Sequence, residues 1–246
     1  MLLRSGRYRY TPRPGPTLAT VAGLALLVSL GVWQLERGAE KADLERELAR
    51  RQSLAPHVIT GEERDPGALA GTPLRASGRY DGARQFLLDN RTRRGVAGYH
   101  VLTPLRLGDG AGLLVNRGWI PAQADRRLKP DVRIGTAPVA VSGIGALPRS
   151  DQIVLGETGY AGDDGWPRIV QRVELGEMAR LLGYELAPVV LRLAADEPGG
   201  YVREWSAYVG IGPDRHYGYA FQWFALAAAL AAIHFVLSVR RVDERA

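Results

Sequence analysis

The stretch Asp214–Arg241 reads DRHYGYAFQWFALAAALAAIHFVLSVRR and decides the fold class of this chain. From Tyr217 to Val239 it contains no aspartate, glutamate, lysine or arginine. A helix of these 23 residues is roughly 35 Å long, which is enough to cross the hydrocarbon core of a bilayer. We therefore predict a transmembrane helix at residues 216–239, whose first turns carry a histidine and several aromatic side chains.

A second uncharged run lies near the other end of the chain, at residues 17–35. Its 19 residues come close to the length that a spanning helix needs. A cleaved signal peptide is the alternative, but its apolar region is usually shorter, and no small-residue cleavage motif follows Leu35. The sequence therefore favours an uncleaved anchor, followed by a helix that runs out of the membrane to about Ser53.

Arginines flank the two predicted spans on the sides of the chain termini. Four precede the first span and three follow the second. Because positive residues accumulate on the cytoplasmic side of a membrane, we predict that both tails, residues 1–16 and 240–246, are cytoplasmic. Residues 36–215 then form a domain outside the cytoplasm, in a periplasm or its equivalent, and the two spans contact membrane lipid.

The remaining composition excludes several classes of protein. Outside the tails, basic and acidic residues nearly balance, so the net charge of +6 indicates topology and no nucleic-acid partner. A mean hydropathy of -0.12 excludes a transporter with many spans. The absence of cysteine excludes disulfides, thiolate metal sites and iron–sulfur clusters. None of the four histidines has a zinc-site spacing, and no common catalytic motif occurs, so we expect no enzyme.

The region between the spans has the pattern of short strands separated by glycine-rich turns. Apolar and polar residues alternate, and turn-forming residues bound each run. We expect strands at 73–80, 85–88, 99–107, 112–116, 139–144, 152–155, 188–193 and 201–208, and a helix at 173–182. The predicted fold class is membrane α+β, in which two transmembrane helices flank a β-rich extracytoplasmic domain with one or two helices, formed as a barrel or a strongly curved sheet.

Small residues recur at four-residue spacing in both predicted spans. Such stripes allow close packing of helix backbones, although alanine is also simply common here. If the spans pack antiparallel, their outer ends meet. This packing would bring together six side chains: Trp33, Gln34, Arg37, His216, Tyr219 and Trp223.

His216, Tyr219 and Trp223 lie at positions i, i+3 and i+7, and therefore on one face of a helix. An imidazole can bind haem iron, and aromatic side chains can pack on the macrocycle. His216 is thus a candidate metal ligand. The alternative is an ordinary belt of aromatic residues at a membrane interface, with a histidine that reaches water.

The segment Val115–Pro121 places an arginine and an indole where a strand meets a glycine. Arg117 could bind an anionic group in a bidentate manner while Trp119 covers an apolar face. The alternative is a structural strand end with a buried tryptophan.

Taken together, these residues resemble the surfeit-locus family of cytochrome oxidase assembly factors from end to end. The matching segments are Leu30–Leu35 with Arg37 and Lys41, Pro73-Leu74, Gly78, Asp89–Arg91, Gly98-Tyr99, Thr103–Leu105, Val115–Pro121, His216, Tyr219-Ala220 and Gln222–Phe224.

The resemblance implies two spans around an extracytoplasmic domain and no enzymatic activity. It implies binding of haem a, received from haem a synthase, with His216 as iron ligand, and insertion of the haem into subunit I of cytochrome oxidase. Two alternatives stay open: a membrane chaperone that stabilises subunit I without carrying haem, and a membrane-tethered enzyme.

Overall fold

The computed structural model describes residues 4–5, 8–108, 110–125, 128–148, 165–205 and 212–241. The chain divides into two compact units. The first, here called the helical unit, combines residues 1–47 with residues 207–246, and the second, the β-domain, comprises residues 48–206. Each unit is described by itself.

Two long helices, α1 (Pro14–Gln52) and α4 (Pro213–Ser238), dominate the helical unit. Both are long and apolar enough to cross a membrane. Only 6% and 11% of their most apolar windows are buried, which distinguishes them from the core helices of a soluble protein. As predicted, α1 continues without a break from its apolar part into the charged stretch.

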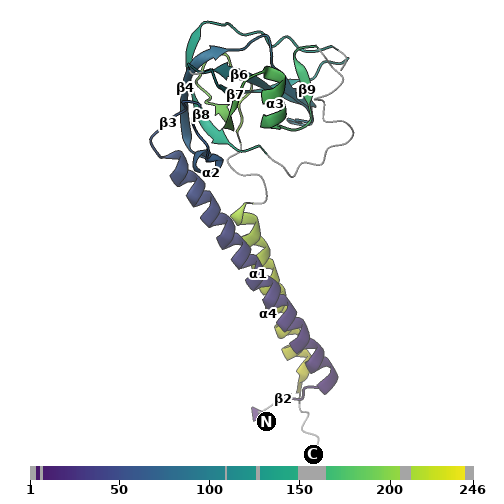
Figure 1. Ribbon diagram of the computed structural model, residues 1–246. Coiled ribbons are helices and arrows are strands. Elements are labelled where there is room, and N and C mark those ends of the chain that lie inside the picture. The colour runs from purple at the N-terminus through teal and green to yellow at the C-terminus, as the bar shows by residue number, and fades with distance from the viewer. Residues whose placement is uncertain are drawn as a thin grey trace, which may run out of the picture. The chain divides into compact units, whose positions relative to one another are not determined.

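The two helices pack side by side through glycines (Figure 1). A Cβ atom placed at Gly31 would lie 2.6 Å from the ring of Phe224, and one at Gly38 would lie 2.5 Å from the ring of Tyr217. The residue numbers of these contacts increase along α1 while they decrease along α4. The two helices are therefore antiparallel. The predicted packing is confirmed, with Gly31 of the predicted stripe at a close contact on α1 and with Ala220 and Ala227 buried on α4.

A small sheet that the sequence analysis missed joins the terminal ends of the two helices. Strands β1 (Arg4–Ser5), β2 (Tyr8–Tyr10) and β11 (Val239–Arg241) pair antiparallel in the order β1-β2-β11. The amide of Thr11 extends this pairing with a 2.8 Å bond to the carbonyl of Ser238. The ring of Tyr10 stacks on that of Phe235 at 6.1 Å.

The β-domain is built on a closed ring of five strands. These are β4 (Pro73–Tyr80), β8 (Pro138–Ala146), β10 (Leu186–Leu193), β7 (Gly112–Pro121) and β6 (Gly98–Arg106), in that order. The ring closes because β4 pairs with β8 along its length and with β6 at its last two residues. The expectation of a barrel is therefore met.

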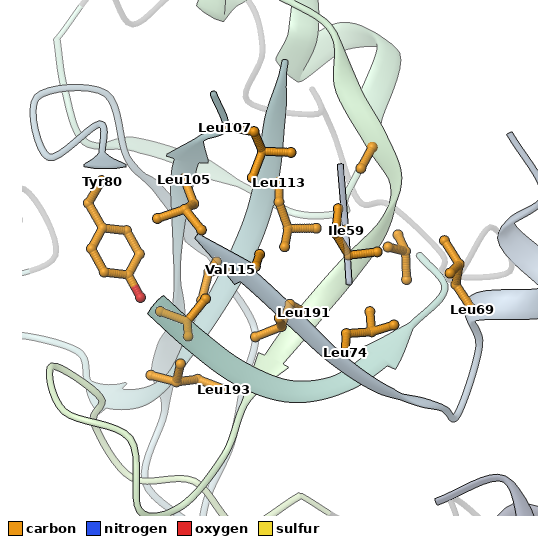
Figure 2. Packing of buried hydrophobic residues seen from close by; sticks show 14 residues of the cluster. Ile59, Leu69, Leu74, Tyr80, Leu105, Leu107, Leu113, Val115, Leu191 and Leu193 are labelled. Atoms are coloured by element: carbon orange, nitrogen blue, oxygen red, sulfur yellow. The ribbon is translucent and has the colours of Figure 1, made fainter. Parts of the chain in front are cut away.

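The interior of the ring holds the main hydrophobic core, part of which Figure 2 shows. Alternate residues of β4 point inward, so Leu74, Ala76 and Tyr80 are buried while Arg75 is exposed. Leu191 and Leu193 enter the same core from β10. This alternation is the period-two pattern from which the strands were predicted.

Short elements extend the ring. Strand β3 (His57–Val58) lies beside β4, while β5 (Phe86–Leu88) joins β6 to β9 (Arg168–Val170). Helix α2 (Pro66–Leu69) caps one side, and α3 (Leu175–Leu182) packs Met178 and Leu182 into a second core beside β5.

Strands β3 and β9 were not predicted, and two of the predicted strands differ from the structure by more than two residues. The strand expected at 112–116 continues to Pro121, because a bulge at Gly118 lets the chain turn without leaving the sheet. Residues 201–205 form only an isolated bridge between Val202 and Trp119, so the closing strand predicted at 201–208 is absent from its described part. Residues 206–208, like the strand predicted at 152–155, lie outside the described residues.

Candidate functional site

The first candidate site lies in the first turn of α4. The Nδ1 atom of His216 is 2.8 Å from the Oε1 atom of Gln34 on α1. Because an amide oxygen only accepts hydrogen bonds, Nδ1 carries a proton, and Nε2 of the neutral ring carries a lone pair. Among the described residues, no hydrogen bond involves this Nε2. The ring is therefore held in the tautomer of a metal-ligating histidine whose other nitrogen is fixed by a neighbour.

The three aromatic candidates of the helical unit differ in exposure. Tyr219 and Trp33 are each 47% exposed, while Trp223 is half-buried. Such exposure leaves ring faces open to lipid or to a flat ligand. Arg37 lies over the ring of Trp33 at 6.0 Å and donates a 2.7 Å bond to Glu40, which lowers the pKa of Glu40. The positive charge of Arg37 is therefore already paired with the carboxylate of Glu40.

Arg117 belongs to the β-domain and is 3% exposed. Its guanidinium donates to the carbonyls of Gly199 at 2.7 Å and Val132 at 3.0 Å, and to the side-chain oxygen of Gln85 at 3.1 Å. Burial is the main cause that lowers its pKa. In this arrangement the guanidinium binds the domain's own loops, so the geometry gives it the structural role that the sequence analysis kept as the alternative.

A β-bulge in β7 is the local cause of the burial of Arg117. Register between β6 and β7 shifts between the pairs His100–Trp119 and Leu102–Asn116, so that two residues of β7 lie opposite one residue of β6. Gly118 adopts a φ of 114°, and a Cβ atom there would lie 2.7 Å from the carbonyl of Val202. A bulge redirects a side chain relative to the regular alternation, which explains the burial of Arg117.

Trp119 is also buried, at 9% exposure, and its indole N–H donates a 2.6 Å bond to the carbonyl of Arg91. The eight candidate residues thus fall into two groups. The helical unit contains Trp33, Gln34, Arg37, His216, Tyr219 and Trp223, and the β-domain contains Arg117 and Trp119. Of the first group, the structure joins His216 to Gln34 and Arg37 to Trp33.

Two further histidines have defined partners that the sequence analysis did not identify. Nδ1 of His234 lies 3.2 Å from the hydroxyl of Thr20 on α1. Nδ1 of His100 lies 3.1 Å from the amide nitrogen of Asn116 across the β6–β7 pair. The only sequence signal for either was a polar side chain within an apolar run.

The fold and the paired spans define a class of protein: a barrel domain carried between two apolar helices that pack against each other. The chain matches the model of the SURF1 family over residues 21–228. It is 25% identical to an uncharacterized SURF1-like protein of Mycobacterium tuberculosis over 222 residues, which cover 88% of this chain and 80% of that protein. It is 24% identical to the human Surfeit locus protein 1 over 84% of this chain and 72% of that protein.

This chain belongs to the SURF1 family. The predicted family is thereby confirmed. Membership in a family of cytochrome oxidase assembly factors supports an assembly role.

Proposed function

We propose that this chain is a membrane-anchored assembly factor that binds haem a through Nε2 of His216 and passes it to subunit I of cytochrome c oxidase. The observation that carries the proposal is the 2.8 Å contact between His216 Nδ1 and Gln34 Oε1, because it leaves Nε2 with a lone pair. When bound, haem would supply an iron atom that can accept an imidazole nitrogen as a ligand. The donor set of this chain fits that requirement.

The surroundings of His216 also fit a flat, apolar ligand. Trp33 and Tyr219 present exposed rings, and Trp223 lies half-buried two turns along α4 from His216. In the proposed site these rings shield one side of the ligand from lipid. Arg117 and Trp119 are left out of the proposed site, because their polar groups are bound within the β-domain.

The proposal places α1 and α4 across the bacterial inner membrane. The basic tails face the cytoplasm, so His216 lies at the periplasmic surface, where haem a synthase would deliver its product. A transfer protein must also release its ligand. A single histidine ligand, with the second position left exchangeable, suits that need better than two fixed ligands, and it makes this chain a carrier rather than an enzyme.

The test is to produce the full chain in cells that make haem a and to compare wild type with His216→Ala. We expect the wild type to purify with haem a and a Soret band, and His216→Ala to lose most of both. His234→Ala is the matched control, because it removes a histidine from the same helix pair and should retain haem. Equal haem in wild type and His216→Ala would remove His216 from the site.

A second measurement separates the proposal from a chaperone role without haem. Subunit I should copurify with this chain more strongly when haem a synthase is present than when it is deleted. If copurification is unchanged by the deletion and the isolated protein is colourless, the chain stabilises subunit I without carrying haem.

A further inference from the structure

The small sheet at the terminal ends of α1 and α4 (Figure 1) brings arginines from different strands into register. In the antiparallel pairing of β2 with β11, Arg9 lies directly opposite Arg240. Residues opposite each other in such a pair project to the same face of the sheet, with Cβ atoms about 5 Å apart. The pairing of β1 with β2 also places Arg4 at the register position opposite Arg9. We call these three positions the arginine row.

The positive charge of the arginine row is not balanced within the part of the chain that the structure describes. Arg9 and Arg240 are exposed, and neither side chain has a hydrogen bond, an ion pair or a cation–π contact with a described residue. The two tails together contain seven arginines against two acidic residues. Like charges that lie opposite each other destabilise a sheet. An anion bound by both arginines would therefore relieve a repulsion that the folded chain contains.

The face of the sheet that carries the row is not covered by α4. The neighbour of Arg9 in β2 is Tyr10, whose ring stacks on that of Phe235 at 6.1 Å. Successive side chains of a strand point to opposite faces, so Arg9 lies on the face away from this contact. The guanidinium groups of Arg9 and Arg240 are thus accessible to a ligand.

An apolar surface lies directly beside the sheet. The last turn of α4 exposes Phe235, Val236 and Leu237, and the chain passes from this turn straight into β11. When α1 and α4 cross a bilayer, these side chains contact acyl chains and the sheet lies at the level of the lipid head groups. A ligand that combines an anionic group with acyl chains fits both surfaces, whereas a soluble anion uses the charge alone.

We propose that the arginine row binds the phosphate group of an anionic phospholipid at the membrane surface. A guanidinium group donates two parallel hydrogen bonds to phosphate oxygens, and two opposed guanidinium groups can share one phosphate. The bound lipid would hold β2 against β11, and so the terminal ends of the two helices together. The site lies at the opposite end of α4 from His216 and does not depend on haem binding.

The test uses the full chain in micelles of an uncharged detergent, titrated with dioctanoyl phosphatidylglycerol. Binding is followed by the ¹H–¹⁵N resonances of the arginine Nε–H groups. We expect saturable shifts of the Arg9 and Arg240 resonances. Dioctanoyl phosphatidylcholine has the same acyl chains and a phosphate but no net charge, and it should bind about tenfold more weakly.

Glycerol phosphate, which has the phosphate without acyl chains, distinguishes a lipid site from a site for free phosphate. At the concentration at which phosphatidylglycerol saturates the shifts, we expect glycerol phosphate not to displace it. Equal affinity for the two lipids, or displacement of phosphatidylglycerol by glycerol phosphate at equal concentration, would overturn the proposal.

Variants distinguish the arginine row from general positive charge. Arg9→Gln and Arg240→Gln should each weaken phosphatidylglycerol binding about fivefold, and the double variant about 30-fold. Arg9→Lys keeps the charge and should retain most of the affinity. Arg13→Gln is the matched control, because it removes an exposed arginine from the same end of the helical unit but outside the sheet, and it should bind like wild type. Equal losses in Arg13→Gln and Arg9→Gln, or unchanged binding in the double variant, would contradict a site at the row.

Discussion

The two units of this chain each hold a histidine whose Nδ1 atom contacts a side-chain amide, and the two contacts have opposite polarity. In the helical unit, the amide oxygen of Gln34 accepts from His216. In the β-domain, the amide nitrogen of Asn116 donates to His100. In the neutral rings, Nε2 consequently carries a lone pair in His216 and a proton in His100.

This difference shows that the binding capacity of Nε2 depends on whether the oxygen or the nitrogen of an amide contacts Nδ1. A lone pair at Nε2 suits a metal ion, whereas an N–H suits an anion. The choice is enforced by different means in the two units. The Asn116 amide is oriented by a backbone N–H within the bulge, whereas Gln34 is positioned by the packing of α1 against α4.

The largest expected effect comes from separating α1 from α4. Gly31→Leu would place a side chain where a Cβ atom alone lies 2.6 Å from Phe224, which we expect to destabilise the pair by about 3 kcal/mol. Gln34 would then no longer hold His216, and haem content should fall. The measurement is haem per protein, together with unfolding of the helix pair in detergent.

The matched control for this change is Gly218→Leu, because a Cβ atom at Gly218 meets nothing within 4 Å. It should leave both properties near wild type. The tautomer of His100 should be unaffected in either variant. A Gly31→Leu protein with normal haem content would contradict the packing argument.

A smaller effect is expected from changing the partner of His216 alone. Gln34→Ala removes the acceptor for Nδ1, and loss of such an orienting partner typically weakens metal binding 10- to 100-fold, or about 1.4 to 2.7 kcal/mol. Gln34→Glu retains an acceptor and should preserve affinity. Haem titration of the apo-proteins measures the affinity of both variants. Identical affinities for wild type and Gln34→Ala would show that this hydrogen bond does not contribute to haem binding.

His100 should make the stability of the β-domain depend on pH. Its pKa is lowered from 6.5 to about 4, so the unfolded chain binds the proton more tightly than the folded one. The contribution of the neutral His100 ring to the free energy of unfolding is then fully present above pH 6.5. It is lost as the pH decreases toward 4, which lowers the free energy of unfolding by about 2 kcal/mol once the partial exposure of the ring is considered.

Denaturant unfolding of the full chain at pH 7 and pH 4, followed by tryptophan fluorescence, measures this loss. The variant His100→Gln should lose less stability over the same interval. A variant with the same loss as wild type would show that other groups cause the pH dependence.

The smallest effect concerns His234. The hydroxyl of Thr20 donates to the carbonyl of Pro16, so His234 donates from Nδ1 to Thr20 and carries a lone pair on Nε2, as His216 does. Its Nε2, however, is buried and has no partner among the described residues. Thr20→Val should destabilise the pair by only about 0.6 kcal/mol and leave haem content unchanged. A large loss of haem would assign His234 to the haem site.

The sequence predicted those features that arise from local pattern. Uninterrupted apolar runs identified both spans, and alternation identified β4 and β10. The sequence analysis expected a barrel or a strongly curved sheet, but it did not predict which strands close the ring. The pairing of β4 with both β8 and β6 joins segments that are distant in the sequence. The direction of Arg117 was not predictable, since a bulge reverses the alternation on which such a prediction relies.

The two histidine contacts also differ in how far the sequence could predict them. Gln34 and His216 were grouped because the helices that carry them were expected to pack, although 182 positions separate them. His100 and Asn116 are only 16 positions apart, but a histidine in a strand has no pattern that names its partner. Their relation depends on register, which a single sequence does not specify.

The small sheet of β2 and β11 has a consequence for the order of events during synthesis. Tyr10 pairs with Val239, and Arg9 with Arg240, so a strand that precedes α1 is paired with the strand that follows α4. In the order of the chain, α4 and β11 follow every residue of the β-domain, so they emerge from the ribosome after it. The β-domain, whose strands lie wholly between the two helices in the sequence, can therefore complete its ring before α4 meets α1. The helix pair is assembled last, and with it the contact that sets the tautomer of His216.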